Sequence, residues 1–376
     1  MKKPALTLLF MLCSSLSISA ERKFVQPELI IDDRFTIELA AAPPLVEHPM
    51  LATIDPQGRM FISESDGQNL QKAELLKQRP RFVRMLEDTD RDGVYDKSTI
   101  FADKMVMPEG ALWHQGALYI ISSPYLWRLE DTDGDGVADR RDKIMGYMEF
   151  DGRANQHGPW LGPNGLLYFT GGIFGYDLVG SDGVHAVKGT SAGVFACRTD
   201  GSDIRVICHA GINPVELAFT PWGDMLGTCA IFDSVGGRHD SLNHWIHGGQ
   251  YGPKDYGSTR EGPASLKRTG YRLGTVVRWG QVAPAGLLRY RGRHLGKDFL
   301  GDFFSCHFNT HEVRHSSLVP SGSTFGAEDE VFLRSPSIDF HPTDVLEDHD
   351  GSLLVIDTGG WLSWGCPTSK LAKPQL

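Results

Sequence analysis

A strand–turn–strand unit recurs along this sequence, and its recurrence constrains the fold more than any other feature. The clearest copy is His157–Gly172, in which a polar start and a short strand precede a Pro-Asn-Gly turn and the apolar strand Leu166–Thr170. Proline presets φ in such a turn, while asparagine and glycine tolerate positive φ. Five further segments follow the same plan: Ala52–Ser63, Ala111–Ser122, Glu216–Thr228, Gly286–His307 and Asp344–Asp357.

Each copy leaves room for one or two more strands, and the copies lie about 45–70 residues apart, a spacing typical of propeller blades. Six such units predict an all-β fold, a six-bladed β-propeller. The 43 glycines and the absence of helical periodicity disfavour a helical solenoid. We expect Phe35–Ala40 to supply the strand that closes the ring. Little chain follows Asp357, so the last blade should be short or incomplete.

The first 20 residues have the pattern of a secretory signal peptide. Lys2 and Lys3 precede an apolar core, Leu6–Leu12, and small residues follow at Ser17–Ala20. A retained membrane anchor is the alternative, but the apolar run is short for a bilayer. We therefore expect a mature chain of residues 21–376, one propeller domain without a membrane span, that is periplasmic or secreted. The net charge of −10 disfavours nucleic acid as a partner.

Five cysteines remain after the signal segment, so at least one thiol has no partner within the chain. Export permits disulfides. Cys197 and Cys208 lie on segments that read as neighbouring strands, and they form either a disulfide or two buried thiols. No Cys-x-x-Cys-His motif for covalent haem occurs.

Two Asp-rich loops lie about one blade apart and match each other closely. Alternating carboxylates followed by glycine suit calcium, which takes six to eight oxygen ligands around a sharp turn. Both loops follow strand-like runs, so we expect them at outer hairpin turns with a structural role. A solvated turn that binds nothing is the alternative. The predicted ligands are Asp88, Asp90, Asp92 and Asp96 in the first loop, and Asp131, Asp133, Asp135 and Asp139 in the second.

Polar residues recur at equivalent places in the copies. In a propeller, residues before the innermost strand and after the second strand gather near the central channel, where convergent polar groups usually form a site. Histidine, acid and amide side chains together can act as general acid and base or bind a metal. For each residue alone, a structural hydrogen bond between blades is the alternative. The expected set is His48, Glu64, Asp66, Glu109, His157, Asn213, Glu216, His307, Asn309, His311, His341, Asp344 and Asp357.

The run Asp240–Gly252 resembles the Asp-Glu-Ile/Leu-Asn…Gly-Gly-Asn-Tyr-Gly segment of the soluble quinoprotein glucose dehydrogenase and aldose sugar dehydrogenase superfamily. The stretch Asn213–Pro221 resembles that superfamily's Asn-Pro…Phe-x-Pro element. The mature chain as a whole is most similar to the bacterial group named putative membrane-bound dehydrogenase domains. This likeness rests on the Asp loops and the opening run, on Ala283–Gly286 and His307–His311, and on the stretch from His341 to Trp361.

This resemblance implies a six-bladed propeller with a pyrroloquinoline quinone site. His157 stands where the base of that superfamily lies, and Asn213 where an amide contacts the quinone. Catalytic roles extend to Glu216, His307, His311, His341 and Asp344. Where the superfamily uses arginines for the quinone carboxylates, this chain has Asp357; Arg153 and Arg238 would substitute. No haem-binding domain follows the propeller, so the electron acceptor would be a separate protein such as a c-type cytochrome.

The first functional hypothesis is an exported oxidoreductase that acts on a sugar or polyol, with His157 as base. An alternative is a calcium-dependent propeller hydrolase or lyase resembling gluconolactonases, with Glu64, Asn213 and Asp357 around an axial metal. The third is a carbohydrate-binding propeller without catalysis. Bound quinone with dye-linked sugar oxidation would separate the first from the others.

Overall fold

The computed structural model describes residues 24–150, 156–233, 237–251 and 274–362. The predicted signal segment and Cys366 lie outside these residues. Almost all regular structure in the described part is β-strand, and helix is limited to α1 (Lys72–Gln78) and the 3-10 turn η2 (Lys297–Phe299). No helix in the described part of the chain is long and apolar enough to cross a membrane.

Antiparallel sheets follow one another along the chain, and each begins with one of the repeated units. The first two sheets are β2 (Pro49–Ile54), β3 (Met60–Glu64), β4 (Arg81–Glu87) and β5 (Lys97–Met105), then β6 (Leu112–His114), β7 (Ala117–Ser122), β8 (Tyr125–Glu130) and β9 (Arg140–Met145). The third is β10 (Gln156–Leu161), β11 (Leu167–Gly171), β14 (Gly193–Cys197) and β15 (Arg205–Cys208).

The remaining sheets continue the same order. The fourth is β16 (Asn213–Phe219), β17 (Met225–Asp233), β18 (Gly237–Trp245) and β19 (Val277–Arg278). The fifth is β20 (Pro284–Arg289), β21 (Phe303–His307), β22 (Glu312–Ser321) and β23 (Thr324–Arg334), with β1 (Ile30–Ile31) added beside β23. Within the described residues the sixth contains β24 (Pro342–Glu347) and β25 (Leu353–Asp357).

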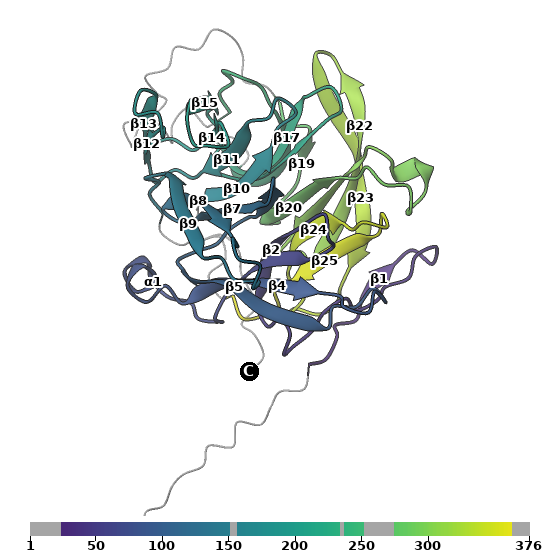
Figure 1. Cartoon of the computed structure of the whole chain (residues 1–376). Coiled ribbons are helices and arrows are strands. Elements are labelled where there is room, and N and C mark those ends of the chain that lie inside the picture. Colours follow the sequence, from purple (N-terminus) through teal and green to yellow (C-terminus); the bar gives the residue numbers. More distant parts are fainter. Residues whose placement is uncertain (1–23, 151–155, 234–236, 252–273, 363–376) are drawn as a thin grey trace, which may run out of the picture.

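The first strands of these sheets touch one another in a closed series. In chain order β2, β6, β10, β16, β20 and β24 each contact the next, and β24 contacts β2. Figure 1 shows β2, near the start of the chain, lying beside β24 and β25, near its end. A hydrogen bond joins these two ends, because the Ala52 N–H donates to Asp344 Oδ2 at 2.9 Å. The arrangement is that of a propeller-like all-β fold.

The second strands of the first, second, third and fifth sheets are covered on both faces. All residues of β3, β7, β11 and β21 are buried. A strand buried on both faces needs a continuous apolar run rather than an alternating one, which is why these stretches read as unbroken runs in the sequence. The Pro163-Asn164-Gly165 turn forms between β10 and β11 as expected, with Gly165 at a φ of 77°.

A β-bulge interrupts the innermost strand of five sheets shortly after its start. A bulge places an extra residue in one strand and re-aims the neighbouring side chains. Hydroxyls on the second strand satisfy the freed backbone groups: the Leu51 N–H donates to Ser63 Oγ, and the Glu216 N–H donates to Thr228 Oγ1, both at 3.1 Å. The register shifts lie between Pro49 and Ala52, His157 and Trp160, Pro214 and Leu217, Pro284 and Leu287, and Pro342 and Asp344.

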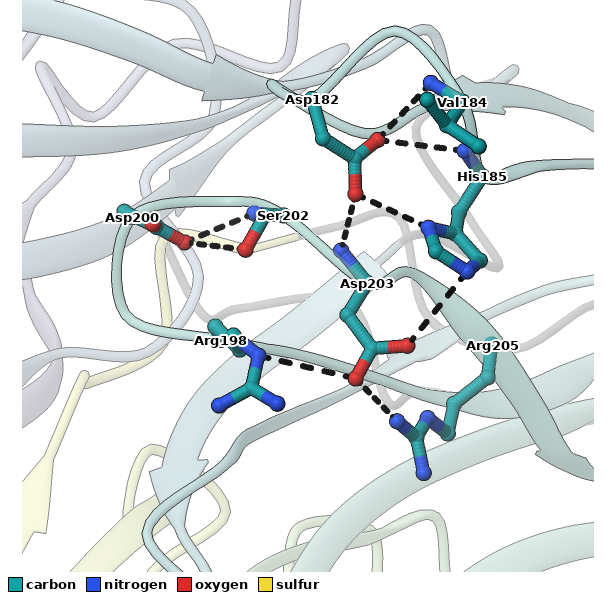
Figure 2. A network of polar contacts seen from close by, with 8 residues as sticks. All are labelled: Asp182, Val184, His185, Arg198, Asp200, Ser202, Asp203 and Arg205. Carbon is teal, nitrogen blue, oxygen red and sulfur yellow. Dashed lines mark hydrogen bonds and ion pairs between the residues drawn. The ribbon is translucent and has the colours of Figure 1, made fainter.

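An additional two-stranded antiparallel ribbon, β12 (Tyr176–Val179) and β13 (Ala186–Gly189), is inserted in the sequence between β11 and β14, the second and third strands of the third sheet. Hydrogen bonds and ion pairs, drawn in Figure 2, connect the turn of this ribbon to the loop between β14 and β15. Asp182 Oδ2 accepts the Asp203 N–H at 2.9 Å and lies 2.9 Å from His185 Nδ1. Asp203 in turn pairs with Arg205. These hydrogen bonds hold the pKa of Asp182 well below its ordinary value.

One expectation about local pairing is wrong. Phe35–Ala40 forms no strand: the Phe35 ring packs against Phe299 and Phe332 of the fifth sheet, and the Ala40 carbonyl accepts the Tyr95 N–H of the first. The segment therefore crosses from the fifth sheet to the first and packs near the sixth without pairing with either of its described strands.

For the cysteines, the structure shows the second of the two alternatives. Cys197 and Cys208 are free, buried thiols, because the register pairs Cys208 with Val194 and leaves Cys197 at the far end of β14. Burial raises the pKa of Cys197 to about 12.

Candidate functional site

The strand registers bring the two predicted sets of polar residues together at one end of the sheets. Residues before or at the start of each innermost strand pair with residues at the end of the second strand. The pairs are Pro49 with Glu64, His157 with Thr170, Asn213 with Ala230, Pro284 with His307, and Pro342 with Asp357. Because the innermost strands contact one another around the ring, these pairs surround a common axis.

Buried polar atoms without a protein partner are concentrated at this end. Leaving a buried donor or acceptor unsatisfied costs about 1–3 kcal/mol, and native proteins contain few such groups. A concentration of them indicates that water or a ligand completes the hydrogen bonding there. Among the described residues the atoms at this end include Asp66 Oδ2, Arg81 Nε and Nη1, both ring nitrogens of His157, Thr170 Oγ1, Asn213 Oδ1, His307 Nδ1 and Asn309 Oδ1.

His157 is the second residue of β10, the inner strand of the third sheet, and lies beside an acid that precedes the second sheet. Its Nδ1 lies 3.9 Å from Glu109 Oε2, and the Gly158 N–H donates to the Glu109 carbonyl at 3.1 Å. Burial lowers the pKa of His157 to about 4. The ring is therefore neutral at pH 7 and can accept a proton, while the Glu109 carboxylate can stabilise the imidazolium that results.

Arg81 also lies at this end of the sheets, although the sequence analysis did not identify it. It begins β4, the third strand of the first sheet, and is 4% exposed. Burial lowers the pKa of its guanidinium, and the charges of Glu109 and Asp66 oppose that shift. Its guanidinium carbon lies 6.0 Å from the ring centre of Trp361, which follows the last strand. The strand pattern gives a signal, since Arg81 takes the inward position of the alternation that buries Val83 and Met85.

The histidines of the fifth and sixth sheets form the opposite part of this end. His307 is fully buried with its ring 4.4 Å from that of Trp279, and burial lowers its pKa to about 3. The His341 ring lies 5.0 Å from that of His311 and 4.2 Å from that of Phe308. Burial and the nearby His311 lower the pKa of His341 to about 4. His307 and His341 are thus neutral at pH 7.

Two of the acids have internal partners. Glu64 forms an ion pair with Arg84 at 2.5 Å and accepts the Glu47 N–H at 2.7 Å. Asp357 Oδ1 accepts the N–H groups of His341 and Gly359, both at 2.9 Å. Oxygens with such partners are less available to an axial metal, so the arrangement gives no support to the hydrolase alternative.

Glu216 and Asp344 lie on inner strands and connect sheets. Glu216 Oε2 accepts the Trp160 indole N–H at 3.0 Å, and Asp344 accepts the N–H groups of Ala52 and Val345. Burial raises the pKa of Asp344 to about 7. Burial and the charge of Asp344 also raise the pKa of Glu216. The two carboxyls therefore interact inside the ring, and their observed contacts are with neighbouring strands.

The structure does not describe the side chains of the two arginines that were expected to hold a quinone. Arg153 lies in residues that the structure does not describe, and for Arg238 the structure describes only the backbone, within β18. The motif that begins at Asp240 has a structural role: Asp240 Oδ2 accepts the N–H groups of Val282 and Ala283, both at 2.9 Å, and so joins the fourth sheet to the fifth.

The two Asp loops lie at hairpin turns between the third and fourth strands of the first and second sheets, as expected. In each loop three carboxylates bring one oxygen apiece to within 4.8 Å of one another: Asp88, Asp90 and Asp92, and Asp131, Asp133 and Asp139. Acids of both loops also accept hydrogen bonds within the loop: Asp96 and Asp139 accept the hydroxyls of Thr89 and Thr132, and Asp92 and Asp135 accept the N–H groups of Val94 and Val137.

Solved structures with the same fold include quinone-dependent sugar dehydrogenases. The quinone (PQQ) domain of pyranose dehydrogenase from Coprinopsis cinerea aligns with a TM-score of 0.63 at 10% identity, covering 89% of this chain and 95% of that one. The PQQ-bound aldose sugar dehydrogenase of Streptomyces coelicolor aligns with a TM-score of 0.58 at 14% identity, covering 92% and 96%. The soluble aldose sugar dehydrogenase of Escherichia coli gives 0.52 at 12%, covering 89% and 97%.

At these identities the likeness shows the fold alone. No curated protein matches the sequence. Residues 25–358 match a family described as a domain of unknown function, DUF7133. This match spans most of the chain, and the protein belongs to the DUF7133 family.

Proposed function

We propose that this protein is an exported oxidoreductase that acts on a sugar or polyol at the end of a six-bladed β-propeller. The closed series of contacts among the innermost strands supports six blades, with the two-stranded last sheet as a short blade. Residues 21–376 form one domain in this proposal, and residues 1–20 are a signal peptide. The sugar dehydrogenases of the same fold support the reaction class.

The observation that carries the proposal is the concentration of unpartnered buried polar atoms around the axis. A sugar or polyol presents many hydroxyl groups, each of which donates and accepts hydrogen bonds. Arginine N–H groups, asparagine and aspartate oxygens and neutral histidine nitrogens match such a ligand. A site built to bind hydroxyl groups strongly rejects analogues that lack them, because its own polar groups are then left unpaired.

His157 is the general base in this proposal. Its imidazole is neutral at pH 7, neither ring nitrogen has a hydrogen-bond partner, and Glu109 Oε2 lies 3.9 Å from Nδ1. The ring takes the proton of the substrate hydroxyl as the carbon-bound hydride leaves. The Glu109 carboxylate then stabilises the imidazolium. Asn213, whose Oδ1 has no protein partner, orients the ligand.

A pyrroloquinoline quinone would supply the hydride acceptor for this reaction. Its carboxylates need cationic or N–H partners, and the unpartnered N–H groups of Arg81 fit that need. Asn213, Asp357, Arg153 and Arg238 were the residues expected to hold it. The electron acceptor in the proposal is a separate protein such as a c-type cytochrome.

Calcium at the two Asp loops is a separate part of the proposal, with a structural role at the rim. The charge of Asp92 raises the pKa of Asp90, which shows the like-charge crowding that a cation would relieve. The carboxylates of the second loop cluster in the same way around Asp131.

The test is reconstitution with pyrroloquinoline quinone followed by dye-linked oxidation of sugars and polyols. His157→Ala should lower kcat at least about 100-fold, the usual contribution of a general base. His294→Ala, at an exposed ring, is the matched control and should leave the rate unchanged. If no quinone binds, or if His157→Ala retains full activity, the oxidoreductase proposal is wrong. Sugar binding without oxidation would indicate the carbohydrate-binding alternative.

A further inference from the structure

We propose that Arg81 is an anchor for a ligand carboxylate at the axial site. The inference rests on the proposed function for its site but concerns a different property, the charge of the ligand. None of the sequence motifs contains Arg81, and its place at the axial end of the sheets follows from the tertiary structure.

The burial of Arg81 without a close counter-ion carries the argument. Its side chain is 4% exposed, and its Nε and Nη1 have no hydrogen-bond partner. Among the described residues no carboxylate oxygen lies within 4.0 Å of its guanidinium nitrogens. An arginine stays charged in proteins, and a buried charge is expensive unless it is paired. Leaving these N–H groups unpaired is costly in the ligand-free protein and is compensated when an anion binds.

The surroundings of the guanidinium direct it toward the site. Trp361 lies on one side of it, after the last strand, with its ring centre 6.0 Å away. The charges of Glu109 and Asp66 lie close enough to affect its pKa. Glu109 is also the acid beside His157, the proposed base. Arg81 therefore lies where the first, second and last sheets meet, near the proposed point of reaction.

A carboxylate suits this position better than a hydroxyl. Hydrogen bonds between a guanidinium and a carboxylate are shorter and roughly twice as strong as neutral ones. Asp66 Oδ2 and the His157 ring nitrogens have no hydrogen-bond partner and remain for the ligand's hydroxyl groups. Two kinds of ligand offer this chemistry: an acidic sugar such as a hexuronate, and the tricarboxylate pyrroloquinoline quinone.

The first measurement compares the melting temperatures of ligand-free wild type, Arg81→Met and Arg34→Met. Arg34 is an exposed arginine and serves as the matched control. If Arg81 serves a ligand, its replacement by an apolar side chain of similar length should leave the melting temperature unchanged or higher, because an unpaired buried charge is removed. A melting temperature several degrees lower, or failure to fold, would show that Arg81 is a structural residue and would overturn the inference.

The second measurement titrates each protein by calorimetry with D-glucuronate, pyrroloquinoline quinone and neutral D-glucose. We expect at least one acid to bind wild type, and Arg81→Met to weaken that binding roughly 10- to 100-fold, as expected for hydrogen bonds to a charged group. Arg81→Lys keeps the charge without the planar fork and should lie between them. Loss confined to glucuronate identifies a substrate carboxylate, and loss confined to the quinone identifies a cofactor carboxylate. Glucose binding should be unaffected.

The results separate this inference from the proposed function. If neither acid binds, or if Arg81→Met binds both as tightly as wild type, the inference is wrong even where sugar oxidation is observed. If an acid binds through Arg81 but no sugar or polyol is oxidised, the inference holds and the oxidoreductase proposal fails.

Discussion

Replacing Asp344 with asparagine should remove a loss of stability that the wild-type protein undergoes as the pH rises. Burial raises the pKa of Asp344 from 3.8 to about 7. Between these values the carboxyl is neutral in the folded protein and ionised in the unfolded chain. Rising pH therefore favours the unfolded chain over this interval, and the effect is complete above about pH 7.

The magnitude follows from the size of the shift. Three pKa units at 1.36 kcal/mol each correspond to about 4 kcal/mol of unfolding free energy. The wild type should lose up to this amount relative to Asp344→Asn between about pH 4 and pH 7. The variant also disturbs one of the hydrogen bonds that Asp344 accepts from Ala52 and Val345, a constant cost of about 1 kcal/mol that does not depend on pH.

Urea unfolding curves at four pH values and constant ionic strength measure this difference. Glu216→Gln provides a second test, because glutamine can still accept the Trp160 indole N–H while the interaction with the Asp344 charge is removed. It should also gain stability relative to wild type as the pH rises. Asp33→Asn, at an exposed acid, is the control. A free-energy gap between wild type and Asp344→Asn that stays constant with pH would refute the reasoning.

Three further predictions concern other parts of the molecule. Glu64→Gln should lower the unfolding free energy by about 3 kcal/mol in urea, because it leaves the partly buried Arg84 without its counter-ion; an unchanged curve would contradict this. A chelator should lower the melting temperature of the wild type, but not that of a double variant with Asp131→Asn and the equivalent change in the first loop, Asp88→Asn. Identical melting of the wild type with and without chelator would exclude structural calcium. Cys197 and Cys208 should resist alkylation in the folded protein, and a melting temperature that falls on reduction would contradict their assignment as free thiols.

Much of the fold is present in local sequence patterns. The turn at Pro163–Gly165 and the apolar runs of the second strands predicted the repeated hairpins, because turn geometry and two-sided burial depend on neighbouring residues. The Asp loops were placed correctly at hairpin turns for the same reason. The ring-closing strand at Phe35–Ala40 was wrong, since its apolar residues are equally suited to packing, and Phe35 packs on the fifth sheet.

The candidate site was likewise predictable from the sequence only in part. The repeat placed His157, Asn213 and His307 at one end of the sheets, because residues at equivalent positions of equivalent hairpins reach equivalent places. It could not separate groups with free polar atoms from those with internal partners, such as Glu64. That difference depends on which side chain from a distant strand lies within about 3 Å, the reach of a hydrogen bond.

The sequence by itself thus determined the repeating hairpin, the all-β class and the end of the sheets where polar residues gather. The tertiary structure alone decided that Arg81 is buried without a close counter-ion and that Glu216 and Asp344 interact. The reason is physical. Strand and turn formation depend on residues adjacent in the chain, whereas burial, the pKa of a carboxyl and the partner of a charge depend on sheets far apart in sequence that meet around one axis.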